Sequence, residues 1–120
     1  MRNLFFGLLF LGCTMPFEPE TPYKRITPPN SYNLWWKEVE ACAAQQSDRG
    51  HVTWFLVAAD SFLTPSGWAS GYWSGGHEIY IAESERWSDW DVVKHEILHE
   101  ILHTGDHPSP PFGICSAKER

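Results

Sequence analysis

The stretch His95-Glu96-Ile97-Leu98-His99 constrains the fold most, because its two imidazoles can act together only if this segment is helical. On an α-helix, residues four apart differ by about 40° of rotation and about 6 Å of rise, so both rings can reach one metal ion. Glu96 lies about 100° round the helix from His95, near enough to reach water on that ion. The pattern predicts a Zn²⁺ site in which the ion lowers the pKa of water to about 7 and Glu96 acts as general base.

The residues around this motif favour a helix from about Asp89 to His103. Ser88 and Asp91 have the spacing of a capping box at its start. An apolar stripe at helical spacing follows, made of Val92, Val93, Ile97, Leu98, Ile101 and Leu102. Gly105 and Pro108 then supply stop signals. The context therefore supports the motif over a surface helix that is merely rich in His and Glu.

The motif occurs twice, in overlapping copies that share His99. In the first copy His95 and His99 are ligands and Glu96 is the base. In the second copy His99 and His103 would be ligands and Glu100 the base, which leaves His95 without a role. We favour the first copy, because it leaves a full helical turn for the chain to swing back with another ligand.

A catalytic zinc site needs a third protein ligand, and the donors downstream of the motif are His103, Asp106, His107 and Glu119. His103 lies about 80° round the helix from His95 and two turns further on, so the three helical histidines could hardly share one ion. His107 follows the helix end, where the backbone can fold back toward the metal. We predict His107 as the third ligand, with Asp106 as the alternative ligand or as an acceptor that orients a ligand imidazole. An ordinary turn residue before Pro108 is the structural alternative for His107.

The last third of the chain resembles the zincin (HExxH) zinc metallopeptidases. The resemblance rests on His95, Glu96 and His99 together with Thr104-Gly105-Asp106-His107-Pro108. The metzincin branch places a glycine and a third histidine where this chain has Leu102 and Gly105, and its later methionine is missing too, since Met1 and Met15 are the only methionines here. The chain is instead similar to small bacterial lipoproteins that pair the motif with a later His-Pro and a closing cysteine. The resemblance implies a zinc-dependent hydrolase acting on a peptide or protein. The alternatives are a non-catalytic metal-binding or interaction lipoprotein of the envelope, and a peptidoglycan amide hydrolase.

The first residues predict export. Residues 1–12 carry Arg2 and an apolar run too short for the roughly 20 residues of a membrane span, which is typical of a signal peptide. The run ends Phe10-Leu11-Gly12-Cys13, which resembles a lipobox with Cys13 as the lipidated residue, although Phe10 departs from the usual aliphatic residue. We expect a protein anchored by lipid to a membrane of the bacterial cell envelope, with ordinary secretion as the alternative.

The remaining cysteines, Cys42 and Cys115, form an even pair that suits a disulfide bond in an exported domain. Residues 13–30 are rich in proline and predict an extended tether, which leaves residues 31–120 for one small metallopeptidase-like domain. The net charge of −6 and the absence of a Lys/Arg run argue against nucleic acid as a partner. We expect a monomer.

Within that domain the expected order is a helix over residues 32–46, strands over 52–58 and 77–82, and then the motif helix. Leu34, Trp35, Val39, Cys42 and Ala43 are the predicted buried stripe of the first helix. This order matches a reduced zincin-like α+β fold with a small sheet. Residues 77–81 are the predicted substrate-side edge strand, and the glycine-rich loop around Tyr72 and Trp73 the wall of the cleft. His77 and Tyr80 are possible hydrogen-bond donors to an oxyanion, with a plain strand role favoured for both.

Overall fold

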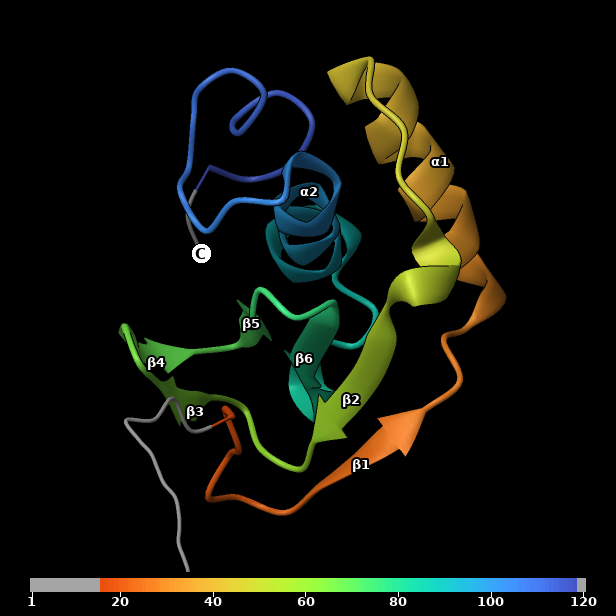
Figure 1. Cartoon of the computed structure of the whole chain (residues 1–120). Coiled ribbons are helices and arrows are strands. Elements are labelled where there is room, and N and C mark those ends of the chain that lie inside the picture. Colours follow the sequence, from red (N-terminus) through yellow and green to blue (C-terminus); the bar gives the residue numbers. More distant parts are fainter. Residues whose placement is uncertain (1–15, 119–120) are drawn as a thin grey trace, which may run out of the picture.

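The computed structural model describes residues 16–118, which form two layers, a sheet with two helices on one face (Figure 1). The strands are β1 (Tyr23–Ile26), β2 (Thr53–Val57), β3 (Phe62–Thr64), β4 (Gly67–Ala69), β5 (Gly71–Trp73) and β6 (Glu78–Ala82). The helices are α1 (Asn30–Ala43) and α2 (Lys94–Leu102), with short 3₁₀ turns at Arg49–His51 and Glu83–Glu85 and a π-helical segment at Asp89–Val93. The predicted α+β class is therefore confirmed.

The main sheet has the strand order β1-β2-β6-β5, and β3 and β4 pair as a separate two-stranded sheet. The two central strands, β2 and β6, are parallel to each other, whereas β1 and β5 are antiparallel to their neighbours. The predicted central strand, β2, thus has the expected position. The prediction that residues 77–81 form the edge strand is wrong, because β5 pairs with β6 and takes the edge itself.

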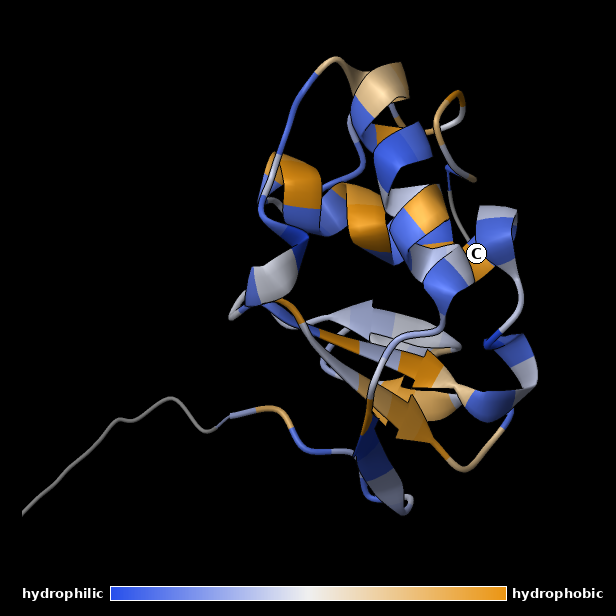
Figure 2. Ribbon diagram, turned by 90° about the vertical axis from the view of Figure 1, so that its right-hand side faces the viewer, coloured by the Kyte–Doolittle hydropathy of each residue, from blue (hydrophilic) through white to orange (hydrophobic). Residues whose placement is uncertain are grey.

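Side chains alternate between the two faces of the central strands, as strand geometry requires. Apolar residues on one face pack beneath the helices, which Figure 2 shows above the sheet; they are Trp54, Leu56, Ile79 and Ile81. Residues on the other face form a smaller apolar cluster with Phe62 and Phe17, namely Val57, Tyr80 and Ala82. Both faces of the sheet are therefore covered, and the helix layer lies on one of them only.

The stripe that helix α1 buries matches the predicted one only in part: Val39 is buried, Trp35 and Ala43 are partly buried against the core, and Leu34 and Cys42 are exposed. Its fully buried apolar residues are Tyr32, Trp36 and Val39, which recur at helical spacing, whereas the predicted Leu34 is 57% exposed. Leu34 lies two residues from both Tyr32 and Trp36, which places it on the opposite side of the helix. The hydroxyl of Tyr32 donates a hydrogen bond to the Arg86 carbonyl at 2.6 Å. Burial raises the pKa of Tyr32 to about 12, so this hydroxyl stays protonated.

The motif helix has about the predicted bounds, because the π-helical segment and α2 together run from Asp89 to Leu102, but both of its ends are built differently from the prediction. The Ser88 side chain makes no capping hydrogen bond, so the predicted capping box is wrong. The Ser88 carbonyl instead accepts from the Val93 N–H at 2.9 Å, which opens the first turn into the π-helical segment. At the other end, His103 adopts a left-handed conformation with φ 52° and terminates α2 two residues before Gly105.

The N-terminal boundary of the folded domain also differs from the prediction. Residues 23–26, expected in an extended tether, form β1 and pair with β2. Phe17 packs against the rings of Tyr72 and Tyr80, with centroid distances of 4.6 Å and 4.9 Å. The prolines are compatible with this strand because they flank β1 and none lies within it. The domain therefore begins well before residue 31, whereas the predicted signal peptide and Cys13 lie outside the described residues.

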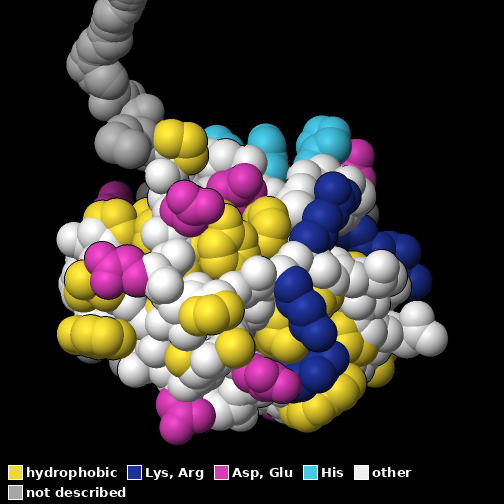
Figure 3. All heavy atoms as spheres, turned by 90° about the horizontal axis from the view of Figure 1, so that it is seen from below, with side chains coloured by type: hydrophobic (Ala, Val, Ile, Leu, Met, Phe, Trp, Pro, Cys, Tyr) yellow, Lys and Arg dark blue, Asp and Glu magenta, His cyan; other side chains and the backbone are white. Residues whose placement is uncertain are grey.

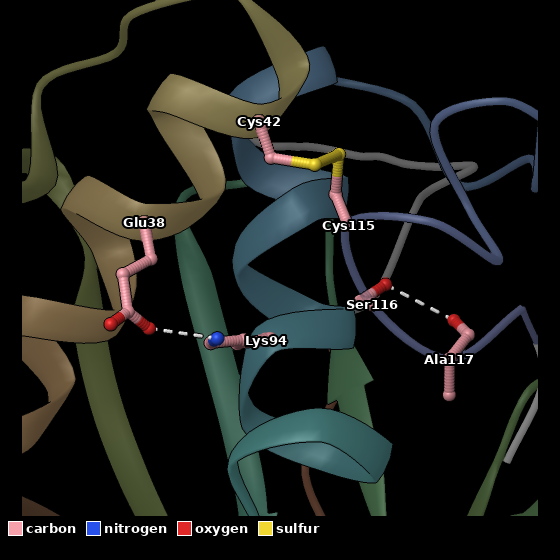
Figure 4. Close-up of a disulfide and its surroundings, with 6 residues drawn as sticks. All are labelled: Glu38, Cys42, Lys94, Cys115, Ser116 and Ala117. Carbon is pink, nitrogen blue, oxygen red and sulfur yellow. Dashed lines mark hydrogen bonds and ion pairs between the residues drawn. A yellow bond between two sulfur atoms is a disulfide. The ribbon is translucent and has the colours of Figure 1, made fainter.

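The predicted disulfide bond between Cys42 and Cys115 is present (Figure 4). It joins α1 to the segment that follows α2, across 73 residues of sequence, with 5.6 Å between the Cα atoms. An ion pair between Lys94 Nζ and Glu38 Oε1 at 2.8 Å links α1 to the start of α2. These two connections hold α1 beside the motif helix. Within residues 16–118, no helix has the length and apolar character needed to cross a bilayer.

Candidate metal centre

The structure brings His95, His99 and His107 together. His95 Nε2 lies 3.2 Å from His99 Nε2 and 3.1 Å from His107 Nε2. The potential ligand atoms of the three residues all lie within 4.8 Å of one another. Two nitrogens bound tetrahedrally to zinc at its usual bond length would be about 3.3 Å apart. We call this group the three-histidine cluster; its dimensions fit one zinc ion.

Hydrogen bonds to the Nδ1 atoms of His95 and His99 determine how these two rings are oriented. His95 Nδ1 is 2.8 Å from the Ala117 carbonyl, and His99 Nδ1 is 2.7 Å from the Thr104 carbonyl. A carbonyl oxygen only accepts, so both Nδ1 atoms carry the proton, and in the neutral rings both Nε2 atoms present lone pairs. Two lone pairs facing each other at 3.2 Å repel unless a cation lies between them. The donor set thus fits a metal ion.

The segment that follows α2 completes the cluster from the other side. It carries His107, and its Phe112 is fully buried with ring centroids 4.8–5.1 Å from all three imidazoles. The Ala117 N–H donates to the Trp90 carbonyl at 3.2 Å, so the residue that orients His95 is itself anchored to the start of the motif helix. The packing of Phe112 against the three rings and the fixed backbone acceptors behind His95 and His99 restrict the rotamers of the cluster.

Glu96 lies beside this cluster and is almost fully buried, with 3% exposure. Strand β5 passes directly over it at Gly71: a Cβ atom at this position would lie 2.9 Å from Glu96 Oε2 and 2.7 Å from Val92 Cγ1. Only glycine lets the strand approach so closely. The backbone of β5 therefore passes close to the carboxylate, which lines the same pocket as the three histidines.

A pocket of about 310 Å³ opens onto these groups, and Glu96 and all three histidines line it. The prediction that Tyr72 and Trp73 wall the cleft is confirmed, since both line this pocket from β5. Burial, with a smaller contribution from the charge of Glu96, raises the pKa of Tyr72, which keeps its hydroxyl protonated at neutral pH.

Neither residue that the sequence suggested as an oxyanion donor lines this pocket. Tyr80 lies in the cluster on the opposite face of the sheet. His77 Nδ1 contacts Glu100 Oε2 at 2.5 Å, outside the three-histidine cluster. Tyr72 does line the pocket, although its ring packs against the same cluster on the opposite face as Tyr80 does.

The second copy of the motif does not form a site of its own with His99. The structure separates its members: His99 joins the three-histidine cluster, while Glu100 and His103 lie with His77. Asp106 belongs to neither group among the described residues, and the acceptors that orient the imidazoles are backbone carbonyls, not its carboxylate. Among the described donors weighed from the sequence, the geometry thus favours His107, whereas Glu119 lies outside the described residues.

No protein-family model, curated protein or solved structure matches this chain significantly. The functional argument therefore rests on the arrangement of side chains.

Proposed function

We propose that this protein is a zinc-dependent peptidase of the bacterial envelope, with His95, His99 and His107 as zinc ligands and Glu96 as general base. The observation that carries the proposal is the convergence of three imidazole Nε2 atoms in the same pocket as a buried carboxylate. Metal binding alone needs no such carboxylate. A general base, in contrast, must reach the water that it deprotonates.

Each group has a separate role in this proposal. A zinc ion on three protein ligands would keep an open position, polarise a carbonyl oxygen and acidify water. Glu96 would accept the proton from the attacking water and pass it to the leaving amine. Tyr72, which lines the pocket and keeps its hydroxyl protonated, would donate a hydrogen bond to the carbonyl oxygen.

The substrate class follows from the strand beside the pocket. Strand β5 lies at the edge of the main sheet and lines the pocket with Gly71, Tyr72 and Trp73. An edge strand can pair with an extended chain through main-chain hydrogen bonds, which are independent of side-chain identity. This favours a peptide or protein segment in extended conformation, and the reaction would be hydrolysis of its amide bond.

Replacing Glu96 by Gln tests the role of the base. The variant keeps the size of the side chain but cannot accept the proton, so turnover should fall by about 10²–10⁴-fold while the zinc content stays that of the wild type. The measurement is cleavage of a peptide library and of peptidoglycan fragments, with elemental analysis of the same samples. Glu83→Gln is the matched control, because Glu83 is exposed on the 3₁₀ turn at Glu83–Glu85 and does not line the pocket.

Three outcomes would contradict parts of the proposal. If the wild type cleaves neither peptides nor peptidoglycan, the protein is a metal-binding lipoprotein and not an enzyme. If it cleaves only peptidoglycan amides, the substrate class is wrong although the chemistry holds. Loss of turnover in Glu100→Gln with activity retained in Glu96→Gln would favour the second copy of the motif.

We also propose that Cys13 is lipidated and anchors the protein to the membrane. The support is the apolar run that ends in Leu11-Gly12-Cys13. Cys13→Ser should abolish incorporation of radiolabelled palmitate and move the protein from the membrane fraction to the soluble one. Labelling that persists in this variant would exclude Cys13 as the acceptor.

A further inference from the structure

A second group of metal-binding side chains lies on the other side of Trp73 from the three-histidine cluster. His77, Glu100 and His103 place their potential ligand atoms within 4.8 Å of one another. His77 comes from the turn before β6, Glu100 from the last turn of α2 and His103 from the end of that helix. We call these residues the His77–Glu100–His103 cluster.

The carboxylate at the centre of this cluster is held rigidly. Glu100 is 2% exposed, and its Oε1 accepts a hydrogen bond from Trp73 Nε1 at 2.7 Å. Its Oε2 is directed at His77 Nδ1, 2.5 Å away. A buried carboxylate is costly unless its charge is compensated, and here one oxygen is fixed by the indole while the other faces the imidazole. The second oxygen is therefore placed as a metal ligand.

The two histidines approach that carboxylate from the solvent side. Their rings have centroids 5.5 Å apart, and the side chain of His77 is 46% exposed. His77 and His103 both have positive φ, 63° and 52°, a conformation that non-glycine residues rarely adopt. Figure 3 shows histidine side chains gathered along one rim of the molecule. A cation in solution can thus reach both rings without a change in the fold.

Trp73 separates this cluster from the proposed catalytic one. Its indole stacks on the His99 ring, with a centroid distance of 6.0 Å and an interplanar angle of 13°. It meets the His103 ring edge-on, with a centroid distance of 5.3 Å. Because His99 and Glu100 are consecutive on α2, they project about 100° apart around the helix. Two ions can therefore bind side by side without sharing a ligand.

We propose that the His77–Glu100–His103 cluster is a second metal site, which binds a borderline divalent cation such as Zn²⁺, Ni²⁺ or Cu²⁺. Two imidazoles with one carboxylate suit these ions, whereas Ca²⁺ and Mg²⁺ require oxygen ligands. The ion takes the place of the hydrogen bond between Glu100 and His77 and has both groups as ligands. Three protein ligands leave room for water, and the site binds metal whether or not the protein is an enzyme.

Zinc stoichiometry tests the second site. Full-length protein, stripped with a chelator and dialysed against Zn²⁺, should bind about two ions per chain, and His77→Ala and His103→Ala should each bind about one. Both substituted residues are exposed, so these variants should keep the circular dichroism spectrum of the wild type. His51→Ala is the matched control: its exposed ring lies 5.4 Å from that of His77, outside the cluster, and it should still bind about two ions.

A variant that lacks one ligand of the three-histidine cluster gives an independent measurement of zinc binding at the second site. His107→Ala removes an exposed ligand of the three-histidine cluster and should leave the second site able to bind zinc, with that binding lost when His103→Ala is added. One ion in the wild type that survives in His77→Ala and His103→Ala would overturn the second site. Loss of an ion in His51→Ala would overturn the ligand set.

Discussion

At the residue scale, the hydrogen bonds behind the imidazoles matter as much as the imidazoles themselves. The Ala117 and Thr104 carbonyls select the Nδ1–H tautomer of His95 and His99, and thereby turn both Nε2 lone pairs toward His107. The third ring is the exposed one, and its place depends on the segment after α2.

His107 lies in the three-histidine cluster and its neighbour Asp106 does not, so substituting each of them tests which one is the third ligand. In a His103→Ala background, His107→Ala should weaken zinc binding by about 100-fold or more, since even residues behind a ligand are worth 10–100-fold. Asp106→Ala should bind zinc as its parent does, because Asp106 lies outside the cluster. Competition with a chromogenic chelator measures both affinities. The reverse order would make Asp106 the third ligand.

At the scale of elements, the site depends on the contact between an edge strand and a helix. Strand β5 lies close enough to α2 that Gly71 meets Glu96 and Val92, while Trp73 reaches Glu100. The same strand therefore supports the proposed base and the proposed second metal site. Its position is set by antiparallel pairing with β6, in which Gly71 lies opposite Ile81.

Gly71→Ala tests this close approach. The new methyl group would meet Val92 Cγ1 at 2.7 Å and Glu96 Oε2 at 2.9 Å, so either the strand or the carboxylate must move. We expect a loss of about 1–3 kcal/mol in the free energy of unfolding, as for other overpacked sites, together with reduced turnover. Urea denaturation and peptide cleavage measure the two effects. Gly76→Ala is the control, since the nearest atom to the new methyl group would be Ser74 Oγ at 3.8 Å; an equal loss there would contradict the steric explanation.

At the scale of the whole molecule, the disulfide bond links the stability of the domain to the geometry of the site. Cys115 is bonded to α1, and two residues later Ala117 orients His95. Between the helix end and Cys115 the chain places His107 and Phe112 against the other rings. The segment that closes the three-histidine cluster is thus held at both ends.

Removing the bond should therefore weaken both folding and metal binding. Closing a loop of this length contributes about 4 kcal/mol on the chain-entropy model, so Cys42→Ala with Cys115→Ala should lower the free energy of unfolding by about that amount. Zinc affinity should fall as well, because the segment that carries His107 and Ala117 loses one of its connections to the rest of the domain. Denaturation with and without dithiothreitol provides the check: the reductant should destabilise the wild type and leave the double variant unchanged. A wild type that is insensitive to reduction would show that the bond contributes little.

The sequence by itself determined the local features of this protein. Helical spacing brought His95, Glu96 and His99 to adjoining faces, a run of β-forming residues marked β2, and partial alternation marked β6. The even cysteine pair indicated the bond between Cys42 and Cys115. These signals depend on the spacing of nearby residues or on the number of cysteines, so they can be read without knowledge of the fold. Tertiary structure decided the rest, including β1 within the supposed tether, β5 as the edge strand in place of residues 77–81, and the acceptors behind His95 and His99. Strand order and the choice of main-chain acceptors depend on contacts between segments far apart in the chain. Because every residue has the same carbonyl oxygen, no residue type indicates which carbonyl will accept from a histidine.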